Sequence, residues 1–172
     1  LTGLVTPVKG EVLIDGKDFS AADEALKNEI MKKCGVMYQS GALFSSMTLK
    51  ENVAMPLELY SSYTAAEISE LASYKLALVG LGGFDDFYPS EISGGMKKRA
   101  ALARALALDP KIVYCDEPSA GLDPISSKRL DDLFKELNQT LGTTFVIVTH
   151  ELQSIFNIGT NSIFLDGKVK NI

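Results

Sequence analysis

Polar residues follow three apolar runs of this sequence that have the composition of buried strands. VMY is followed by Gln39, IVYC by Asp116 and Glu117, and FVIV by Thr149 and His150. In an open parallel α/β sheet, ligands bind outside the carboxyl ends of the strands. We therefore expect these side chains to converge on one site. Taken alone, the Asp-Glu pair is more typical of a loop start or a helix cap, the histidine is often structural, and Gln39 carries almost no information.

A second feature, the SGG sequence at 93–95, has the geometry to bind an anion. It opens an alanine-rich stretch, and a glycine-flanked helix start presents N–H groups and the positive end of the helix dipole to a phosphate oxygen. The alternative is a plain Ser N-cap followed by two permissive glycines. The basic run from Lys97 to Arg99 is most simply a solvated face, and near an anion it would add favourable potential.

The elements that must position these residues alternate between strand and helix. Hydrophobic patterns predict strands at 34–38, 111–115 and 143–148 and helices at 22–33, 93–108 and 125–141. This alternation predicts an α/β fold with a parallel sheet covered by helices on both faces. The apolar runs IVYC and FVIV fit strands that are buried from both sides.

Residues 45–90 differ from the rest of the chain and indicate a helical insertion. The apolar positions that recur at helical spacing there are Ile68, Leu71, Tyr74, Leu78 and Leu81.

Turn signals mark the two ends of the sequence. Asp15-Gly16 predicts a hairpin over 10–19, and Asp166-Gly167 predicts another over 162–170. Leu1 to Leu4 have the pattern of the last turn of a helix.

The composition is that of an ordinary globular protein. The 172 residues are 46% hydrophobic and 23% charged, which suffices for one domain with an inserted subdomain. The net charge of -5 argues against nucleic acid as the main partner, and no apolar run is long enough to span a bilayer. Cys34 and Cys115 lie in apolar strand-like runs, which indicates buried, reduced thiols in a cytosolic protein rather than a disulfide or a metal site.

The stretch EISGGMKKRAALARALALDPKIVYCDEPSAGLDP, at 91–124, resembles the nucleotide-binding subunit of ABC transporters. Ile92 to Met96 are similar to the signature motif, IVYCDEP to the Walker B motif with its following glutamate, and Ser119 to Asp123 to the D-loop. THE at 149–151 is similar to the H-loop, and Gln39 to the Q-loop. The five motifs occur in the family's order and spacing and extend over nearly the whole chain.

The resemblance implies a partial P-loop NTPase, or RecA-like, fold in which a parallel sheet is flanked by helices. It also implies a division of the chain, taken over 1–172 as a truncated ABC ATPase domain. The RecA-like core would comprise 1–44 and 109–172, and an inserted helical subdomain that carries the signature motif would comprise 45–108.

By the same resemblance, the cofactors are ATP and Mg²⁺. Asp116 would hold Mg²⁺, Glu117 would polarise the attacking water, Gln39 would contact both metal and water, and His150 would contact the γ-phosphate. The residues that would serve the nucleotide of a second ATPase subunit, in a homodimeric sandwich, are Ser93, Gly94, Gly95, Met96 and Asp123.

One motif of the family, the Walker A loop G-x-x-x-x-G-K-[ST], does not occur in this sequence. The two Gly-Lys pairs, Gly16-Lys17 and Gly167-Lys168, lack the preceding glycine and the following Ser or Thr. We therefore expect the loop to lie upstream in an ATP-hydrolysing parent protein. We expect the 172-residue chain by itself to bind nucleotide weakly and to be inactive.

Met96 stands where most of the family has glutamine, and with QSGALFSSMTLKENVAMPL at 39–57 it makes the chain similar to the Mla/Mce branch. That resemblance implies an ATPase that powers phospholipid or other lipid trafficking across the bacterial envelope. It would lie on the cytoplasmic face of the inner membrane with an integral membrane permease and a lipid-binding accessory protein, without nucleic acid. The alternatives are an importer for another small substrate, an ABC-type ATPase acting on DNA or ribosomes, and a non-catalytic fragment acting only by protein contacts.

Overall fold

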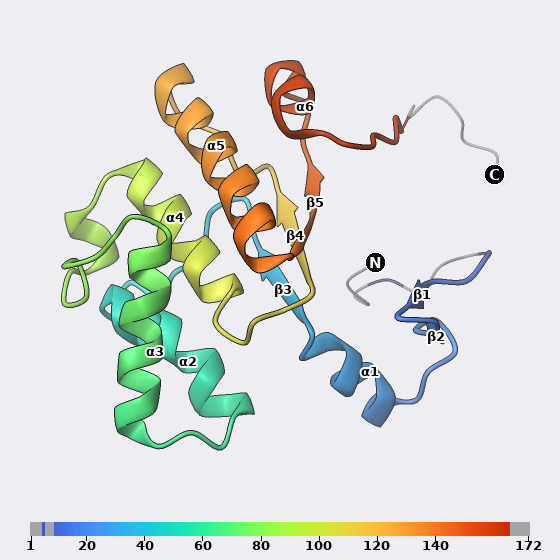
Figure 1. The fold of residues 1–172 in the computed structure, drawn as a ribbon, viewed down its shortest axis with the longest axis horizontal. Coiled ribbons are helices and arrows are strands. Elements are labelled where there is room, and N and C mark those ends of the chain that lie inside the picture. Colours follow the sequence, from blue (N-terminus) through green and yellow to red (C-terminus); the bar gives the residue numbers. More distant parts are fainter. Residues whose placement is uncertain (1–4, 6–8, 166–172) are drawn as a thin grey trace.

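The fold was analysed in a computed structural model, which describes residue 5 and residues 9–165 (Figure 1). The helix end predicted over Leu1 to Leu4 and the turn predicted at Asp166-Gly167 lie outside the described residues. The elements, in chain order, are β1 (Leu13–Ile14), β2 (Lys17–Asp18), α1 (Glu24–Met31), β3 (Cys34–Met37), α2 (Leu49–Tyr60), α3 (Ala65–Leu78), a 3₁₀ turn (Pro89–Glu91), α4 (Gly94–Ala105), β4 (Ile112–Asp116), α5 (Pro124–Leu141), β5 (Thr144–Val148) and α6 (Leu152–Ile158).

The central sheet is parallel, with strand order β3-β4-β5. Its register pairs Met37 with Cys115 and Cys115 with Ile147, so these side chains share the face that packs against α4 and α5. On that face the rings of Phe134 in α5 and Phe145 in β5 meet at a centroid distance of 5.0 Å. The predicted α/β fold with a parallel sheet and flanking helices is confirmed.

Burial differs between the two strands predicted to be covered on both sides. In β4, Val113, Tyr114 and Cys115 are all buried, as predicted. In β5 no residue is fully buried and Val148 is exposed, so the prediction is wrong for this strand. The reason is position, because β5 lies at the edge of the described sheet and pairs with β4 alone.

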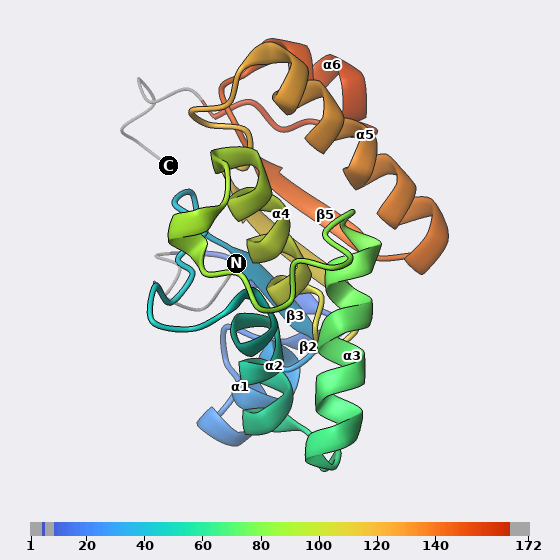
Figure 2. The ribbon, with the colours of Figure 1, turned by 90° about the vertical axis from the view of Figure 1, so that its left-hand side faces the viewer.

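Helices α2, α3 and α4 form a second layer beside the sheet (Figure 2). Capping boxes begin α2 and α3, where Thr48 pairs with Glu51 and Thr64 with Glu67. The predicted helical character of this region is confirmed, and the predicted apolar positions are buried or partly buried except Tyr74, which is exposed. The fully buried residues of α3 are Ile68, Ala72, Lys75 and Leu76. No helix among residues 9–165 is both long and apolar enough to cross a bilayer.

The hairpin predicted around Asp15-Gly16 is present as the antiparallel pair β1 and β2. Both turn residues have positive φ, 51° at Asp15 and 74° at Gly16, which is the geometry of a tight hairpin turn. Ile14, Phe19 and Ile30 form a small core between this hairpin and α1.

Candidate functional site

The carboxyl edge of the central sheet carries the polar residues singled out in the sequence. β3 ends two residues before Gln39, β4 ends at Asp116, and β5 ends just before Thr149 and His150. The strand pairing continues into this edge, where the backbone N–H of Glu117 donates to the carbonyl oxygen of Val148 at 2.9 Å. The predicted convergence is therefore observed at the level of the backbone.

Glu117 is the most constrained of these residues. Its φ of 44° is left-handed, a conformation that costs a residue with a Cβ about 1 kcal/mol or more and that surrounding contacts must hold. The carboxylate is largely buried, with 17% of the side chain exposed. One of its oxygens lies 2.8 Å from Nδ1 of His150, and the other accepts a hydrogen bond from the Thr149 hydroxyl at 3.4 Å.

His150 lies on the solvent side of this pair, with 81% of its side chain exposed. The hydrogen bond to Glu117, followed by the negative charge of Glu117, raises the pKa of His150 above its ordinary value. The imidazole is therefore protonated, and its contact with Glu117 is an ion pair, over a wider pH range than for a free histidine.

Asp116 and Gln39 differ from Glu117 because their side chains are free. Both residues are exposed, and neither side chain makes a hydrogen bond to another residue in the described part of the chain. The backbone of Gln39 is held, since its carbonyl oxygen accepts a hydrogen bond from the Lys98 ammonium group, which also donates to the carbonyl of Glu117 at 3.3 Å. The edge thus combines two free oxygen-bearing side chains with one fixed carboxylate.

The SGG residues occupy the start of α4. Ser93 is the N-cap, and its hydroxyl oxygen accepts a hydrogen bond from the N–H of Met96 at 3.2 Å, as the capping interpretation predicts. Gly95 faces α5, where a Cβ on it would lie at an ordinary contact distance of 3.9 Å from the Cβ of Ser126, and Gly94 faces Leu122 just before α5. Ser93, Gly95 and Met96 line a groove of about 530 Å³ between α3, α4 and α5.

Asp123 is the N-cap of α5. Its carboxylate accepts hydrogen bonds from the N–H groups of Ile125 and Ser126, both at 3.0 Å, and Pro124 occupies the first helical position. The hydrogen bonds from Ser126, followed by those of the neighbouring backbone, lower the pKa of Asp123. Among the described residues, no hydrogen bond joins Asp123 or Ser93 to the Glu117 and His150 pair, so the structure places the site residues in two groups.

A family model described as "ABC transporter" matches residues 1–120 of this chain. The chain belongs to the ABC transporter family.

Relatives in this family extend the match over most of the chain. The "Probable ribonucleotide transport ATP-binding protein mkl" of Mycobacterium tuberculosis is 47% identical over 152 residues, which are 88% of this chain and 42% of that protein. The "Intermembrane phospholipid transport system ATP-binding protein MlaF" of Escherichia coli K12 is 40% identical over 166 residues, 96% of this chain and 62% of that protein. The chain thus spans roughly two-fifths to three-fifths of the length of these curated relatives.

Solved ABC cassettes have the same fold. A dimeric ATP-binding cassette in a post-hydrolysis state, bound to ADP and Pi, aligns with a TM-score of 0.77 at 32% identity and covers 89% of this chain and 68% of that one. A dimeric bacterial ABC transporter cassette aligns with a TM-score of 0.79, also at 32% identity, over 91% of this chain and 69% of that one. The resemblance to ABC nucleotide-binding subunits, and the likeness to the Mla branch, are confirmed.

The oxygen-bearing residues at the sheet edge of this ABC chain suit a magnesium ion that arrives with a nucleotide. Among the described residues, no three His, Cys, Asp or Glu side chains form a group that could hold a metal by themselves. Mg²⁺ usually keeps several waters and binds one or two carboxylates together with substrate phosphates. The free carboxylate of Asp116 and the free amide of Gln39 fit that mode.

Two basic residues that the sequence predicts on a solvated face, Lys98 and Arg99, are buried or hydrogen-bonded in the structure. Lys98 is only 8% exposed, and Arg99 donates hydrogen bonds to the carbonyl oxygens of Val79 and Gly80. The signal was present in the helical spacing, since Lys98 lies three and seven positions before Ala101 and Ala105 on one face of α4. Burial lowers the pKa of Lys98, and the charges of Glu117 and Glu151 oppose this change.

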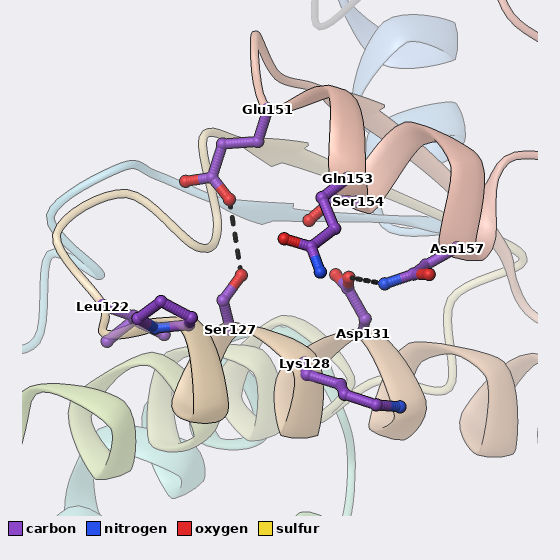
Figure 3. Close-up of a pocket in the computed structure, with 9 residues that line it drawn as sticks. Leu122, Ser127, Lys128, Asp131, Glu151, Gln153, Ser154 and Asn157 are labelled. Atoms are coloured by element: carbon purple, nitrogen blue, oxygen red, sulfur yellow. Dashed lines mark hydrogen bonds between the residues drawn. The ribbon is translucent and has the colours of Figure 1, made fainter.

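Helix α6 was also missed. Leu152, Ile155 and Phe156 have helical spacing, and Gly159 follows the last turn, so the pattern was available. Between α5 and α6 lies a cavity of about 230 Å³, into which the polar side chains of Asp131 and Asn157 point and join at 3.3 Å (Figure 3). Its lining includes Glu151, which accepts a hydrogen bond from Ser127 at 3.3 Å, but none of the residues of the Glu117 site.

Proposed function

We propose that this chain is part of the ATP-binding and ATP-hydrolysing subunit of an ABC transporter. The observation that carries the proposal is the arrangement at the sheet edge. A fixed, largely buried carboxylate, Glu117, lies beside His150, and the free carboxylate of Asp116 directly precedes it. Hydrolysis of a phosphoanhydride needs positioned water and neutralised charge more than covalent chemistry. Glu117 can position the water, and protonated His150 together with a cation held at Asp116 can neutralise the charge.

The proposed roles follow the chemistry of each side chain. Asp116 and Gln39 would hold Mg²⁺, which supplies positive charge to the phosphates when bound. Glu117 acts as the general base that orients and deprotonates the attacking water. His150 leaves its ion pair with Glu117 and donates a hydrogen bond to the terminal phosphate. Its 81% exposed side chain leaves room for that movement.

The second group of residues is assigned to a partner copy. Ser93 to Met96 and Asp123 lie at the starts of α4 and α5, and the helix dipole and the N–H groups at the start of α4 favour phosphate. We assign them to the nucleotide of a second subunit in a homodimer, which is supported by two similar solved cassettes that are described as dimeric. We also assign 1–44 and 109–172 to the core and 45–108 to the helical subdomain.

For the transported substrate we propose phospholipid or another lipid of the bacterial envelope. The relative named for intermembrane phospholipid transport aligns with 96% of this chain. The partners would then be an integral membrane permease and a lipid-binding accessory protein, with this subunit on the cytoplasmic side of the inner membrane. The competing substrate class is a ribonucleotide, because the mycobacterial relative named for its transport is 47% identical.

The test is ATP turnover by the complete protein assembled with its membrane partners in vesicles. Glu117→Gln is expected to lower turnover by about 100-fold or more, because a general base is lost, while ATP binding is retained. Glu70→Gln removes an exposed carboxylate on α3 and serves as the control. Normal turnover in Glu117→Gln contradicts the ATPase assignment, and stimulation by ribonucleotide but not by phospholipid contradicts the lipid assignment.

A further inference from the structure

Lys98 is a buried lysine in the helix that begins with the signature residues. It lies in the second turn of α4, and only 8% of it is exposed. A buried ammonium group is costly unless it is paired or hydrogen-bonded. The acceptors of its hydrogen bonds therefore show what stabilises the Lys98 ammonium group in this position.

Those partners are the backbones of two residues of the proposed catalytic edge. The Lys98 ammonium donates to the carbonyl oxygen of Gln39 and, at 3.3 Å, to the carbonyl oxygen of Glu117. Gln39 follows β3 and Glu117 follows β4, so one side chain of α4 connects the ends of two neighbouring strands.

The contact with Glu117 reaches a backbone in an unusual conformation. Glu117 has a φ of 44°, and the next residue, Pro118, has no N–H to donate. The N–H of Glu117 donates to the carbonyl oxygen of Val148 at 2.9 Å, and its own carbonyl oxygen accepts hydrogen bonds from the Ala120 N–H at 3.1 Å and from Lys98. Because backbone orientation decides where the side chain points, the bond from Lys98 contributes to the direction of the carboxylate, and among these three bonds it is the one that comes from α4.

A second basic residue of α4 holds the loop that follows Gln39. The Arg104 guanidinium donates to the carbonyl oxygens of Gly41 and Ala42, at 2.9 and 2.7 Å. Both loop residues have positive φ, 76° and 49°. The first part of this loop is thus bound to α4 at Gln39, Gly41 and Ala42, and a displacement of α4 moves it as well.

We propose that Lys98 is a positioning residue, which couples the placement of helix α4 to the directions in which Gln39 and Glu117 enter the catalytic edge. The inference rests on the proposed ATPase function. Lys98 does not touch the reacting atoms; it acts through the two backbone carbonyls that it holds. When α4 packs against a second subunit, a change in its position would be passed through the Lys98 ammonium group to the backbones of Gln39 and Glu117.

The experiment measures kcat, KM and ATP affinity of the complete, assembled protein carrying Lys98→Met, Lys98→Gln, Lys98→Arg or Lys97→Met. Lys98→Met is expected to lower kcat by about 10- to 100-fold with ATP affinity changed less than about threefold, because a misplaced base slows chemistry more than binding. Lys98→Arg keeps a charged donor and is expected to recover most of kcat. Lys97→Met is the control, since in the described part of the chain Lys97 makes no side-chain hydrogen bond.

The outcomes separate this inference from the proposed function. If Glu117→Gln abolishes turnover while Lys98→Met turns over ATP as the parent does, the positioning role is wrong and the ATPase assignment stands. A parallel loss of kcat and ATP affinity, with no recovery in Lys98→Arg, also overturns the positioning role. If Lys98→Met does not fold, Lys98→Gln is judged by the same criteria. Full turnover in Glu117→Gln overturns both proposals.

Discussion

At the scale of single residues, the contact between Glu117 and His150 determines what the site can do. The carboxylate oxygen that lies 2.8 Å from the imidazole cannot at the same time bind a water from that side. A nucleotide that draws His150 toward its phosphate therefore also frees Glu117. Under the proposed function, the pair would couple the arrival of the nucleotide to the availability of the proposed base.

The pH dependence of this pair follows from the pKa of His150, which its bond to Glu117 raises above the ordinary value of about 6.5. A raised folded-state pKa means that the pair stabilises the fold fully below about pH 6.5. That contribution is lost as the pH rises through the folded-state pKa. Because His150 is the sole histidine of the sequence, NMR can follow its titration directly.

We expect a titration midpoint above about 6.5 in the parent chain and a clear decrease in Glu117→Gln. Glu151→Gln is the matched control, because the charge of Glu151 raises the pKa of His150 less than Glu117 does. A midpoint that is unchanged by Glu117→Gln would show that the ion pair does not form in solution.

At the scale of elements, α4 is the helix on which the site depends. Its start carries the signature residues, its middle holds two strand ends through Lys98, and its end lies against β3. The close approach to β3 depends on Gly35, where a Cβ would lie 2.2 Å from the carbonyl oxygen of Ala105. A backbone oxygen cannot rotate away as a side chain can, so the end of the helix would have to shift.

Gly35→Ala is therefore expected to destabilise the protein by about 3 kcal/mol, the upper part of the range for overpacked sites. Gly82→Ala is the control, since a Cβ there would meet its nearest neighbour, the Cβ of Ala77, at an ordinary 3.7 Å. The free energy of unfolding from urea denaturation measures both. Equal stability of the two variants would mean that α4 is not seated against β3 in this way.

At the scale of the whole molecule, an ion pair links helix α3 to the loop between α4 and β4. Lys75 in α3 is 2% exposed, and its ammonium lies 2.5 Å from the carboxylate of Asp109, which is 74% exposed and lies between α4 and β4. Removing one partner of such a pair leaves a buried charge uncompensated. Replacing the buried lysine by an apolar residue of similar size removes the buried charge itself.

The two single variants should therefore differ in stability. Asp109→Asn, which keeps a residue tolerant of the positive φ of 49° at this position, is expected to cost about 2 kcal/mol. Lys75→Met is expected to cost less than about 1 kcal/mol, because an apolar side chain of similar shape fills the same space. Thermal or urea unfolding measures both, and a larger loss for Lys75→Met would contradict the account.

Much of the architecture was readable from the sequence because it depends on neighbours along the chain. Asp123, Pro124 and Gly142 mark the two ends of α5, and Gly142 has the left-handed φ of 68° that ends helices. The apolar runs located β3, β4 and β5. The rule that parallel strands expose their carboxyl ends at one edge then placed Glu117 and His150 together.

The tertiary structure alone decided which distant partners the buried charged side chains bind. Lys98 and the Gln39 carbonyl that it binds are 59 residues apart, and Lys75 and Asp109 are 34 apart, so no local pattern links them. Tyr74 fits the helical period of α3 but faces solvent, whereas Lys75 is covered. Burial depends on which distant segment packs against a residue, and the sequence determined this protein's elements and motif order but not those contacts.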